Sequence, residues 1–340
     1  MAAVRTPSEQ SYRSVTNRIG FAMLFFELML NAVSVVIAVI TVVLEMIPHI
    51  DPVAKDCINQ ISYGLLYAAI FMLPVLFFYL ISIRRGAKPI RCGIRWCPET
   101  FAYLFVGLAV VTATAQINAI LVSFFDITAF LPEDLLPTVT TATSNYQLVL
   151  MIFTTAIVPA FVEEFLFRGV VLTNLLPYGK TVAVLGSALL FGIMHQNPAQ
   201  FLYATAAGLV LGYIYVKTRS IWPSVLLHFV NNFIAVIQTA MVERLLDHTA
   251  ELALGVMQAG ILLLGLIAAI FLILRHRDQR RAVLAEGCFE QELPTDADVT
   301  VHDLSFGKRV RLFFSVPMIV FLALCVLMMI PNFLTLMLLS

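Results

Sequence analysis

Long apolar runs separated by short polar breaks dominate the pattern of this chain. A helix that crosses a bilayer needs about 20 predominantly apolar residues, and about nine runs reach or approach that length. The pattern therefore predicts an all-α fold, a polytopic transmembrane helical bundle with about nine spans. The predicted spans cover residues 20–47, 62–83, 101–125, 147–175, 181–196, 200–216, 221–242, 252–274 and 312–338.

Two of these runs, 181–196 and 200–216, are short for a span and are joined by Asn197-Pro198-Ala199. At 1.5 Å per residue each helix reaches only about 24–26 Å, less than a hydrocarbon core of about 30 Å. Irregular backbone at membrane depth is tolerated where protein covers it or where it lines a cavity. We therefore expect this turn to lie inside the bundle, below the far surface.

Composition agrees with a membrane protein and excludes other classes. The chain is 60% hydrophobic and 12% charged, whereas soluble domains are about 45–50% apolar and about 25% charged. The formal net charge of +0 and the scattered basic residues predict no nucleic-acid partner, and the lipid bilayer is the first partner that we expect. Five cysteines at scattered positions predict no disulfide framework.

The distribution of Lys and Arg predicts which side of the membrane each loop faces. When the loops are numbered alternately from the N-terminus, one set holds 19 of the 21 basic residues, counting Arg168 inside the fourth span, and the other holds only Lys55 and Arg244. Basic residues favour the cytoplasmic side. We therefore expect a cytoplasmic N-terminus and, with nine spans, an outward-facing C-terminus at Ser340.

Polar and ionisable side chains occur deep inside three of the predicted spans. A charged side chain at bilayer depth costs about 2.5–3.5 kcal/mol on insertion scales, so such groups persist mainly where they serve a function. Together they predict a hydrolytic site within the membrane. The residues are Glu163, Glu164, Arg168, His195, His228 and Asn232, with Phe191 four positions before His195.

The acidic pair divides into two predicted roles. Glu164 and Arg168 are four residues apart on one helix face, within reach of an ion pair. This pairing neutralises Glu164 and leaves Glu163 as a candidate general base on water. The alternative is that these groups form a structural Glu–Arg pair that holds helices together.

The histidines and Asn232 supply the other predicted catalytic groups. His195 can share a proton with an attacking water or bind a metal through one nitrogen. His228 and Asn232 lie four residues apart on one helix face and can donate to a developing oxyanion. The alternatives are a packed, hydrogen-bonded His195 and an interhelical hydrogen-bonded pair of His228 and Asn232.

The sequence contains none of the usual nucleophile motifs. It has no G-x-S-x-G elbow, no H-E-x-x-H zinc helix and no Gly-rich phosphate loop. The available Glu, His and Asn side chains suit hydrolysis by an activated water, with or without a metal ion.

The order of three motifs resembles a known family. E-E-x-x-x-R at residues 163–168, F-x-x-x-H at 191–195 and H-x-x-x-N at 228–232 resemble the CaaX-protease and bacteriocin-processing (CPBP) family of intramembrane proteases, over about residues 147–240. The resemblance implies a helical bundle whose active-site cavity opens to the cytoplasmic leaflet.

The resemblance also implies residue roles. Glu163 and His195 would activate water, and His228 and Asn232 would form the oxyanion site, with Glu164, Arg168 and Phe191 in support. Whether such enzymes need a divalent metal such as zinc is contested for the family. If a metal is present, its ligands would be Glu163, His195 and His228.

Three regions and one function follow as expectations. Residues 1–146 would hold three N-terminal spans, 147–242 the CPBP-like protease core, and 243–340 C-terminal helices with a polar cytoplasmic segment at 275–311. The expected function is glutamate-dependent intramembrane endopeptidase in a bacterial cell membrane. Its peptide or protein substrate could be lipid-modified or a leader peptide. The alternatives are a non-catalytic scaffold or bacteriocin-immunity protein on the same fold, and a transporter.

Overall fold

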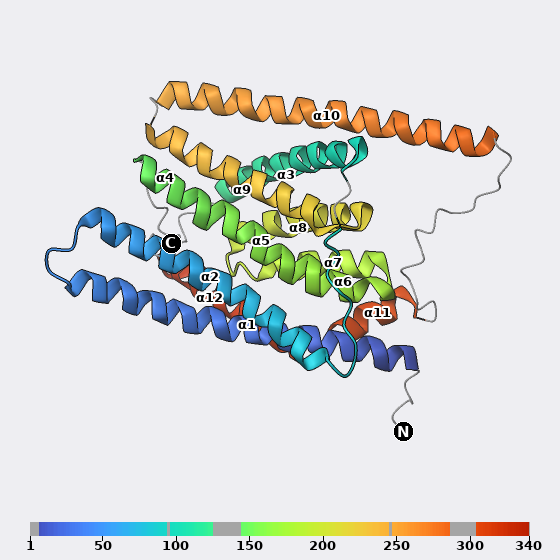
Figure 1. Ribbon diagram of the computed structural model, residues 1–340, viewed down its shortest axis with the longest axis horizontal. Coiled ribbons are helices and arrows are strands. Elements are labelled where there is room, and N and C mark those ends of the chain that lie inside the picture. Colours follow the sequence, from blue (N-terminus) through green and yellow to red (C-terminus); the bar gives the residue numbers. More distant parts are fainter. Residues whose placement is uncertain (1–6, 94–95, 125–143, 245–246, 286–303, 340) are drawn as a thin grey trace.

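The computed structural model describes residues 7–93, 96–124, 144–244, 247–285 and 304–339, and helices make up its regular structure (Figure 1). This confirms the predicted all-α bundle. Pro52, Pro98 and Pro198 begin helices at the first position, where the missing N–H costs nothing. The long helices are α1 (Pro7–Met46), α2 (Pro52–Ser82), α3 (Pro98–Phe124), α7 (Lys180–Ile193), α8 (Pro198–Thr218), α9 (Ile221–Arg244), α10 (Asp247–Ala285) and α12 (Val316–Leu339), with the short α11 (Phe306–Phe313) before the last.

One helical rod, residues 145–178, carries the acidic motif and changes its winding twice. Wider π-helical turns at residues 152–157 and 165–172 flank the α-helical turn that holds the two glutamates. Such π turns are common at functional sites. The rod consists of α4 (Asn145–Met151), η3 (Ile152–Ile157), α5 (Val158–Glu164), η4 (Phe165–Leu172), α6 (Thr173–Leu175) and η5 (Leu176–Tyr178).

Fewer full-length spans are present than the nine that were predicted. Within the described residues, seven helices are long and apolar enough to cross a membrane, or eight if the bent pair α11 and α12 counts as one span. The predicted span 181–196 becomes α7, which has only 14 residues. At 1.5 Å per residue it covers about 21 Å, which is too short to cross the hydrocarbon core alone.

The last predicted span, 312–338, is bent near its start. α12 continues without a break through Pro331 and Asn332. The bend lies between α11 and α12, which meet at an angle of 67°. Pro317 is the second residue of α12. It has no N–H to bond the carbonyl of Phe313, four residues earlier, and its ring would clash with that carbonyl, so α11 and α12 cannot form one continuous helix.

Loops of the two predicted sets gather at opposite ends of the molecule. At one end the loop after α2 is held by Arg18 Nη1, which donates to Gly86 O at 2.9 Å, and by the Ile221 amide, which donates to Arg91 O at 2.9 Å. At the other end Arg244 Nη2 donates to Ser144 O at 2.7 Å. We call these the basic end and the opposite end. The partition of basic residues agrees with this arrangement, and the predicted orientation follows if the basic end is cytoplasmic.

Two native cysteines can test that orientation. Cys92 is exposed in the loop at the basic end, and Cys57 is partly exposed near the start of α2 at the opposite end. With the other cysteines replaced, an impermeant thiol reagent should label Cys92 only from the cytoplasmic side and Cys57 only from outside. The reverse pattern would show that the basic residues mark the outer face.

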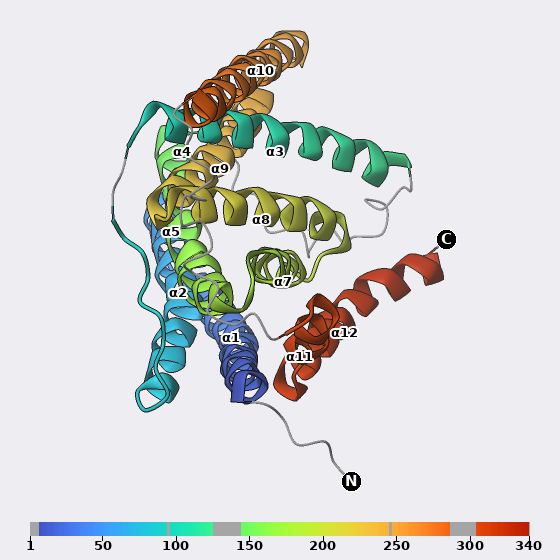
Figure 2. The same ribbon diagram turned by 90° about the vertical axis from the view of Figure 1, so that its right-hand side faces the viewer.

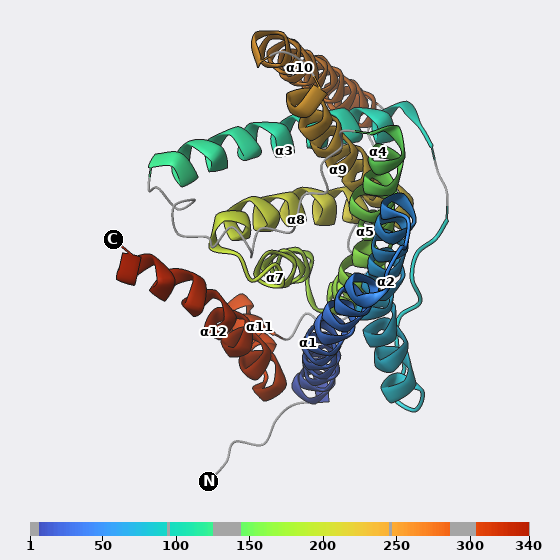
Figure 3. The same cartoon turned by 90° about the vertical axis from the view of Figure 1, so that its left-hand side faces the viewer.

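The central helices enclose the region that carries the motifs. Seen along the long axis, α7 and α8 form a hairpin that lies between the rod 145–178 and the C-terminal α12 (Figure 2). α10 covers α3 on one side of the molecule, and α12 packs against α1 on the other (Figure 3). The three motifs therefore lie on central elements: the rod, α7 and α9.

Candidate active site

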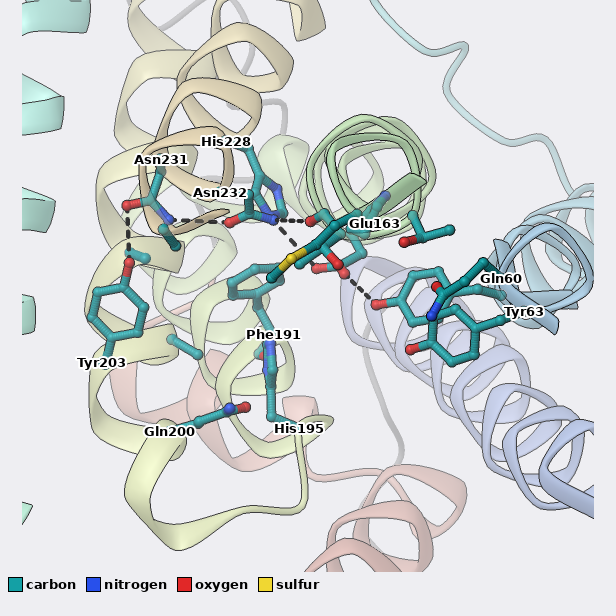
Figure 4. Close-up of a pocket in the computed structure, with 18 of the residues that line it drawn as sticks. Gln60, Tyr63, Glu163, Phe191, His195, Gln200, Tyr203, His228, Asn231 and Asn232 are labelled. Atoms are coloured by element: carbon teal, nitrogen blue, oxygen red, sulfur yellow. Dashed lines mark hydrogen bonds and ion pairs between the residues drawn. The ribbon is translucent and has the colours of Figure 1, made fainter. Parts of the chain in front are cut away.

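A cavity of about 750 Å³ contains the candidate catalytic residues (Figure 4). Its walls come from α1, α2, α3, the rod 145–178, and the helices α7, α8 and α9. Four predicted site residues line it, namely Glu163, His195, His228 and Asn232. Three spans that are far apart in the sequence therefore contribute to one site.

The ion pair expected between Glu164 and Arg168 is present and completely buried. Arg168 Nη1 donates to Glu164 Oε1 at 2.8 Å, and both side chains are 0% exposed. Arg168 Nη2 donates to Gly208 O at 3.1 Å, and the guanidinium lies 4.6 Å from the centre of the Phe191 ring. Phe191 thus acts as a cation–π partner, which accounts for the aromatic position of the second motif. Together these contacts tie the rod to α7 and α8.

Gly208 permits this contact because α8 passes very close to α7. A Cβ atom at Gly208 would lie 3.0 Å from Ala188 Cα, tighter than ordinary packing allows. Because Gly208 has no side chain, α8 can pack close to α7 and the Gly208 carbonyl can accept a hydrogen bond from Arg168. The close packing of α7 and α8 and the position of the buried Arg168 charge are therefore linked.

His228 lies between both glutamates. Its Nδ1 is 3.1 Å from Glu164 Oε1, and its Nε2 is 3.9 Å from Glu163 Oε2. Glu164 accepts from Nδ1, which places the other ring nitrogen towards the cavity. Glu164 therefore orients His228 as well as pairing with Arg168, a second contact that the sequence did not reveal.

Glu163 presents one occupied and one free oxygen. Its Oε1 accepts a hydrogen bond of 2.5 Å from the Tyr67 hydroxyl, and the side chain is only 3% exposed. Its Oε2 has no hydrogen-bond partner among the described residues and faces His228. Sequence analysis missed Tyr67 because a tyrosine in an apolar span carries no charge and belongs to no motif. A buried carboxylate oxygen without a donor is well placed to accept a proton from water.

His195 lies at the end of α7, beside the turn to α8. Its Nδ1 is 2.8 Å from Phe191 O, which leaves Nε2 as the nitrogen that can act in the cavity. The structure shows no direct contact between His195 and Glu163, so a shared role requires a water between them. Glu163 and His195 therefore line the same cavity without contacting each other.

The α7–α8 turn lies inside the bundle, as predicted, but only α7 is short, because α8 has 21 residues and is long enough to cross a membrane. Gln196, with φ of 51°, donates from Nε2 to Glu27 Oε2 at 2.7 Å. Glu27 is near the middle of α1, which runs from Pro7 to Met46. On α3, Asn118 Nδ2 donates to Ala199 O at 2.9 Å. These bonds hold the turn, and with it His195, at depth.

Asn232 is oriented by a chain of hydrogen bonds. The Tyr203 hydroxyl donates to Asn231 Oδ1 at 2.9 Å, and Asn231 Nδ2 donates to Asn232 Oδ1 at 3.1 Å. Asn232 Nδ2 in turn donates to Thr155 O at 3.1 Å. That carbonyl lacks its usual helical partner because Pro159, four residues later, has no N–H. Asn231, which belongs to none of the three motifs, is therefore part of the site.

The suggested metal ligands do not converge. Among the described residues, no group of three His, Cys, Asp or Glu side chains is close enough to hold a metal ion. Glu163, His195 and His228 share the cavity, but His195 uses Nδ1 on a backbone carbonyl and no contact joins it to the other two. The residues present do not fit a three-ligand metal centre in this conformation, and we derive no step through a metal.

The cavity extends away from the basic end, which differs from the expectation of the resemblance if the basic end is cytoplasmic. Its walls continue from Glu163 to Asp56 and Gln60 in the first turns of α2, and to Met151 near the start of the rod. Towards the basic end, residues 166–168 and 170–172 of the rod are completely buried. The cavity therefore connects Glu163 with the opposite end of the bundle.

One segment of the chain matches a known protein family. Residues 145–234 match the family model described as type II CAAX prenyl endopeptidase Rce1-like. This match is consistent with the resemblance of the three motifs to the CPBP family. The matched residues include all three motifs. No solved structure matches the chain.

A curated protein also matches part of the chain. "Putative membrane peptidase YdiL" from Bacillus subtilis is 33% identical over 102 residues. The matched stretch covers 29% of this chain and 41% of that protein, so the alignment spans about two fifths of the relative's length.

Proposed function

We propose that this chain is an intramembrane, glutamate-dependent endopeptidase that hydrolyses a peptide bond with an activated water. The observation that carries the proposal is Glu163, a buried carboxylate with one free oxygen, facing His228 in a cavity that also holds Asn232 and His195. The family match of residues 145–234 and the peptidase name of the curated relative support the same class of reaction.

The first half of the reaction is nucleophilic attack by water. Glu163 Oε2 accepts a proton from a water that His195 Nε2 helps to orient. The water oxygen bonds to the carbonyl carbon of the peptide, and the π electron pair of the carbonyl moves onto its oxygen. Asn232 Nδ2 has a second hydrogen beyond the one given to Thr155 O and donates it to this oxyanion.

The second half is loss of the amine. The electron pair returns from the oxyanion to carbon, the C–N bond breaks, and Glu163 delivers its proton to the departing nitrogen. The products are a carboxylic acid and an amine, and Glu163 is again a carboxylate.

Charge balance favours a protonated His228 as the second oxyanion donor. Glu163 and Glu164 carry two negative charges and Arg168 one positive charge, so one more positive charge makes the buried group neutral. An imidazolium with Nδ1 on Glu164 presents its Nε2 hydrogen to the cavity. His228 can then donate to the oxyanion while Glu164 keeps the ring in place.

The substrate is a peptide or protein segment that reaches Glu163 from the opposite end of the bundle. The cavity walls combine polar side chains such as Asn59 and Gln60 with apolar ones such as Leu211 and Leu227. These walls suit a peptide, and they do not distinguish a lipid-modified segment from a leader peptide. The family model takes its name from enzymes that act on prenylated proteins, and this chain need not share that substrate.

Cell-based peptide profiling tests this function. Cells that carry the parent chain or its Glu163→Ala form should differ in specific C-terminal or leader peptides, with the uncleaved precursors accumulating in the variant. A Glu251→Ala form is the matched control, because Glu251 is exposed on α10 far from the cavity in sequence. Identical peptide sets for the parent and Glu163→Ala, with both proteins at equal abundance, would instead favour the scaffold or immunity role.

A further inference from the structure

A second cavity, of about 590 Å³, lies between α1 and α2 at the basic end. Three arginines line it, Arg18 on α1 and Arg84 and Arg85 just after α2, and no Asp or Glu is among its lining residues. The rest of its wall is largely apolar and includes Phe21 and Leu80. The proposed peptidase reaction does not use this pocket.

The positive charge of the pocket has no carboxylate partner. Arg18 is only 4% exposed, and its side chain donates to backbone carbonyls, from Nη1 to Gly86 O at 2.9 Å and from Nε to Ser14 O at 3.3 Å. None of the three arginines forms an ion pair with another described residue. The two backbone carbonyls orient the Arg18 side chain but do not neutralise its positive charge, so the pocket favours binding of an anion.

The apolar part of the pocket indicates what kind of anion fits. Phe21 is 51% exposed and Leu80 is 55% exposed, and both continue onto the outer surface of membrane-spanning helices. A small soluble anion would leave these side chains uncovered. A phospholipid satisfies both parts, because its phosphate meets the arginines and its acyl chain covers the apolar wall.

We propose that this pocket binds one anionic phospholipid. The headgroup phosphate lies among Arg18, Arg84 and Arg85, and an acyl chain runs along Phe21 and Leu80. Arginine suits this role since its planar guanidinium donates two parallel hydrogen bonds to phosphate oxygens.

The bound lipid has a structural consequence for the candidate active site. Arg18 holds Gly86, the first residue of the segment 86–92. That segment packs on the helices that carry the site, since the Lys88 amide donates to Asn174 Oδ1 at 2.8 Å and Trp222 Nε1 donates to Cys92 O at 2.9 Å. A lipid that orders Arg18 therefore also braces the basic ends of the rod and α9, and we expect it to raise thermal stability.

Lipid binding to the purified full-length chain tests the proposal. The probes are phosphatidylglycerol, phosphatidylcholine and inorganic phosphate, added to protein in neutral detergent, with bound lipid measured by native mass spectrometry and stability by thermal unfolding. Phosphatidylglycerol should bind and raise the unfolding temperature, whereas phosphatidylcholine and phosphate should do neither at equal concentration. Equal stabilisation by phosphate would overturn the lipid assignment in favour of a soluble anion, and equal binding of phosphatidylcholine would overturn the role of charge.

Matched variants separate the pocket from general surface charge. The double variant Arg84→Gln/Arg85→Gln removes two exposed charges and should bind phosphatidylglycerol about 30-fold more weakly, since each basic residue near a membrane surface contributes about a factor of five. Lys217→Gln/Arg277→Gln removes two exposed charges outside the pocket and should bind like the parent. Equal weakening in both double variants would show that the lipid responds to overall charge and would overturn the proposal.

Discussion

A purified Glu163→Gln protein is expected to lose about 10²- to 10⁴-fold of the parent's peptide-hydrolysis rate, the range that a positioned general base contributes. Glutamine keeps the size of the side chain and can still accept the Tyr67 hydrogen bond through Oε1. It cannot take a proton from water. The rate should be measured on a peptide identified by profiling the parent cells, and thermal unfolding should confirm that the variant remains folded.

Tyr67→Phe is the matched control for this prediction. It removes the donor to Glu163 Oε1 and leaves the carboxylate in place, so hydrolysis should fall by much less than in Glu163→Gln. If Glu163→Gln retained the parent's rate, Glu163 would not be the base. If Tyr67→Phe lost as much activity as Glu163→Gln, the hydroxyl itself would have to take part in the reaction.

The sequence alone could predict which ionisable residues line the cavity. Glu163, His195 and His228 are costly at bilayer depth, and this cost singles them out among many apolar neighbours. Their helices meet in the fold, and Asn232 follows from its four-residue spacing to His228 on α9. Their catalytic roles remain predictions that the experiments above address.

Other parts of the site left no signal in the sequence. Tyr67 and Tyr203 are neutral and occur in apolar helices where tyrosines are unremarkable, yet their hydroxyls bond Glu163 and Asn231. Glu164 appeared to be satisfied by Arg168, and only the crossing of α9 over the rod reveals its contact with His228. Contacts of this kind depend on how helices pack, which spacing along one helix cannot reveal.

The number of spans and the direction of the cavity also required the structure. Hydropathy counts apolar residues, so it included α7 among the nine spans although its run was already short for one. It could not show that Gln196 and Glu27 hold the following turn inside the bundle. The cavity extends to the opposite end because the rod is tightly packed between Glu163 and the basic end, where Leu166 and Phe167 are completely buried.

Arg168→Met should destabilise the protein by about 3–5 kcal/mol, the largest stability effect that we expect, because it leaves Glu164 buried without its cation. The loss should appear as a lower unfolding temperature and as unfolding at lower denaturant in detergent micelles. Methionine fills much of the space of the arginine side chain, so lost volume contributes little to the difference.

The double variant Glu164→Gln/Arg168→Met distinguishes charge from packing. It removes both members of the ion pair, and replacing a buried pair with neutral groups is often tolerated, so it should regain most of the stability lost in Arg168→Met. Its activity should be low, because a neutral glutamine replaces the negative charge that lies 3.1 Å from His228 Nδ1 in the parent. A double variant as unstable as Arg168→Met would show that the guanidinium matters through Gly208 and Phe191 and not through Glu164. A stable and fully active double variant would show that the negative charge of Glu164 is not needed to hold His228 in place.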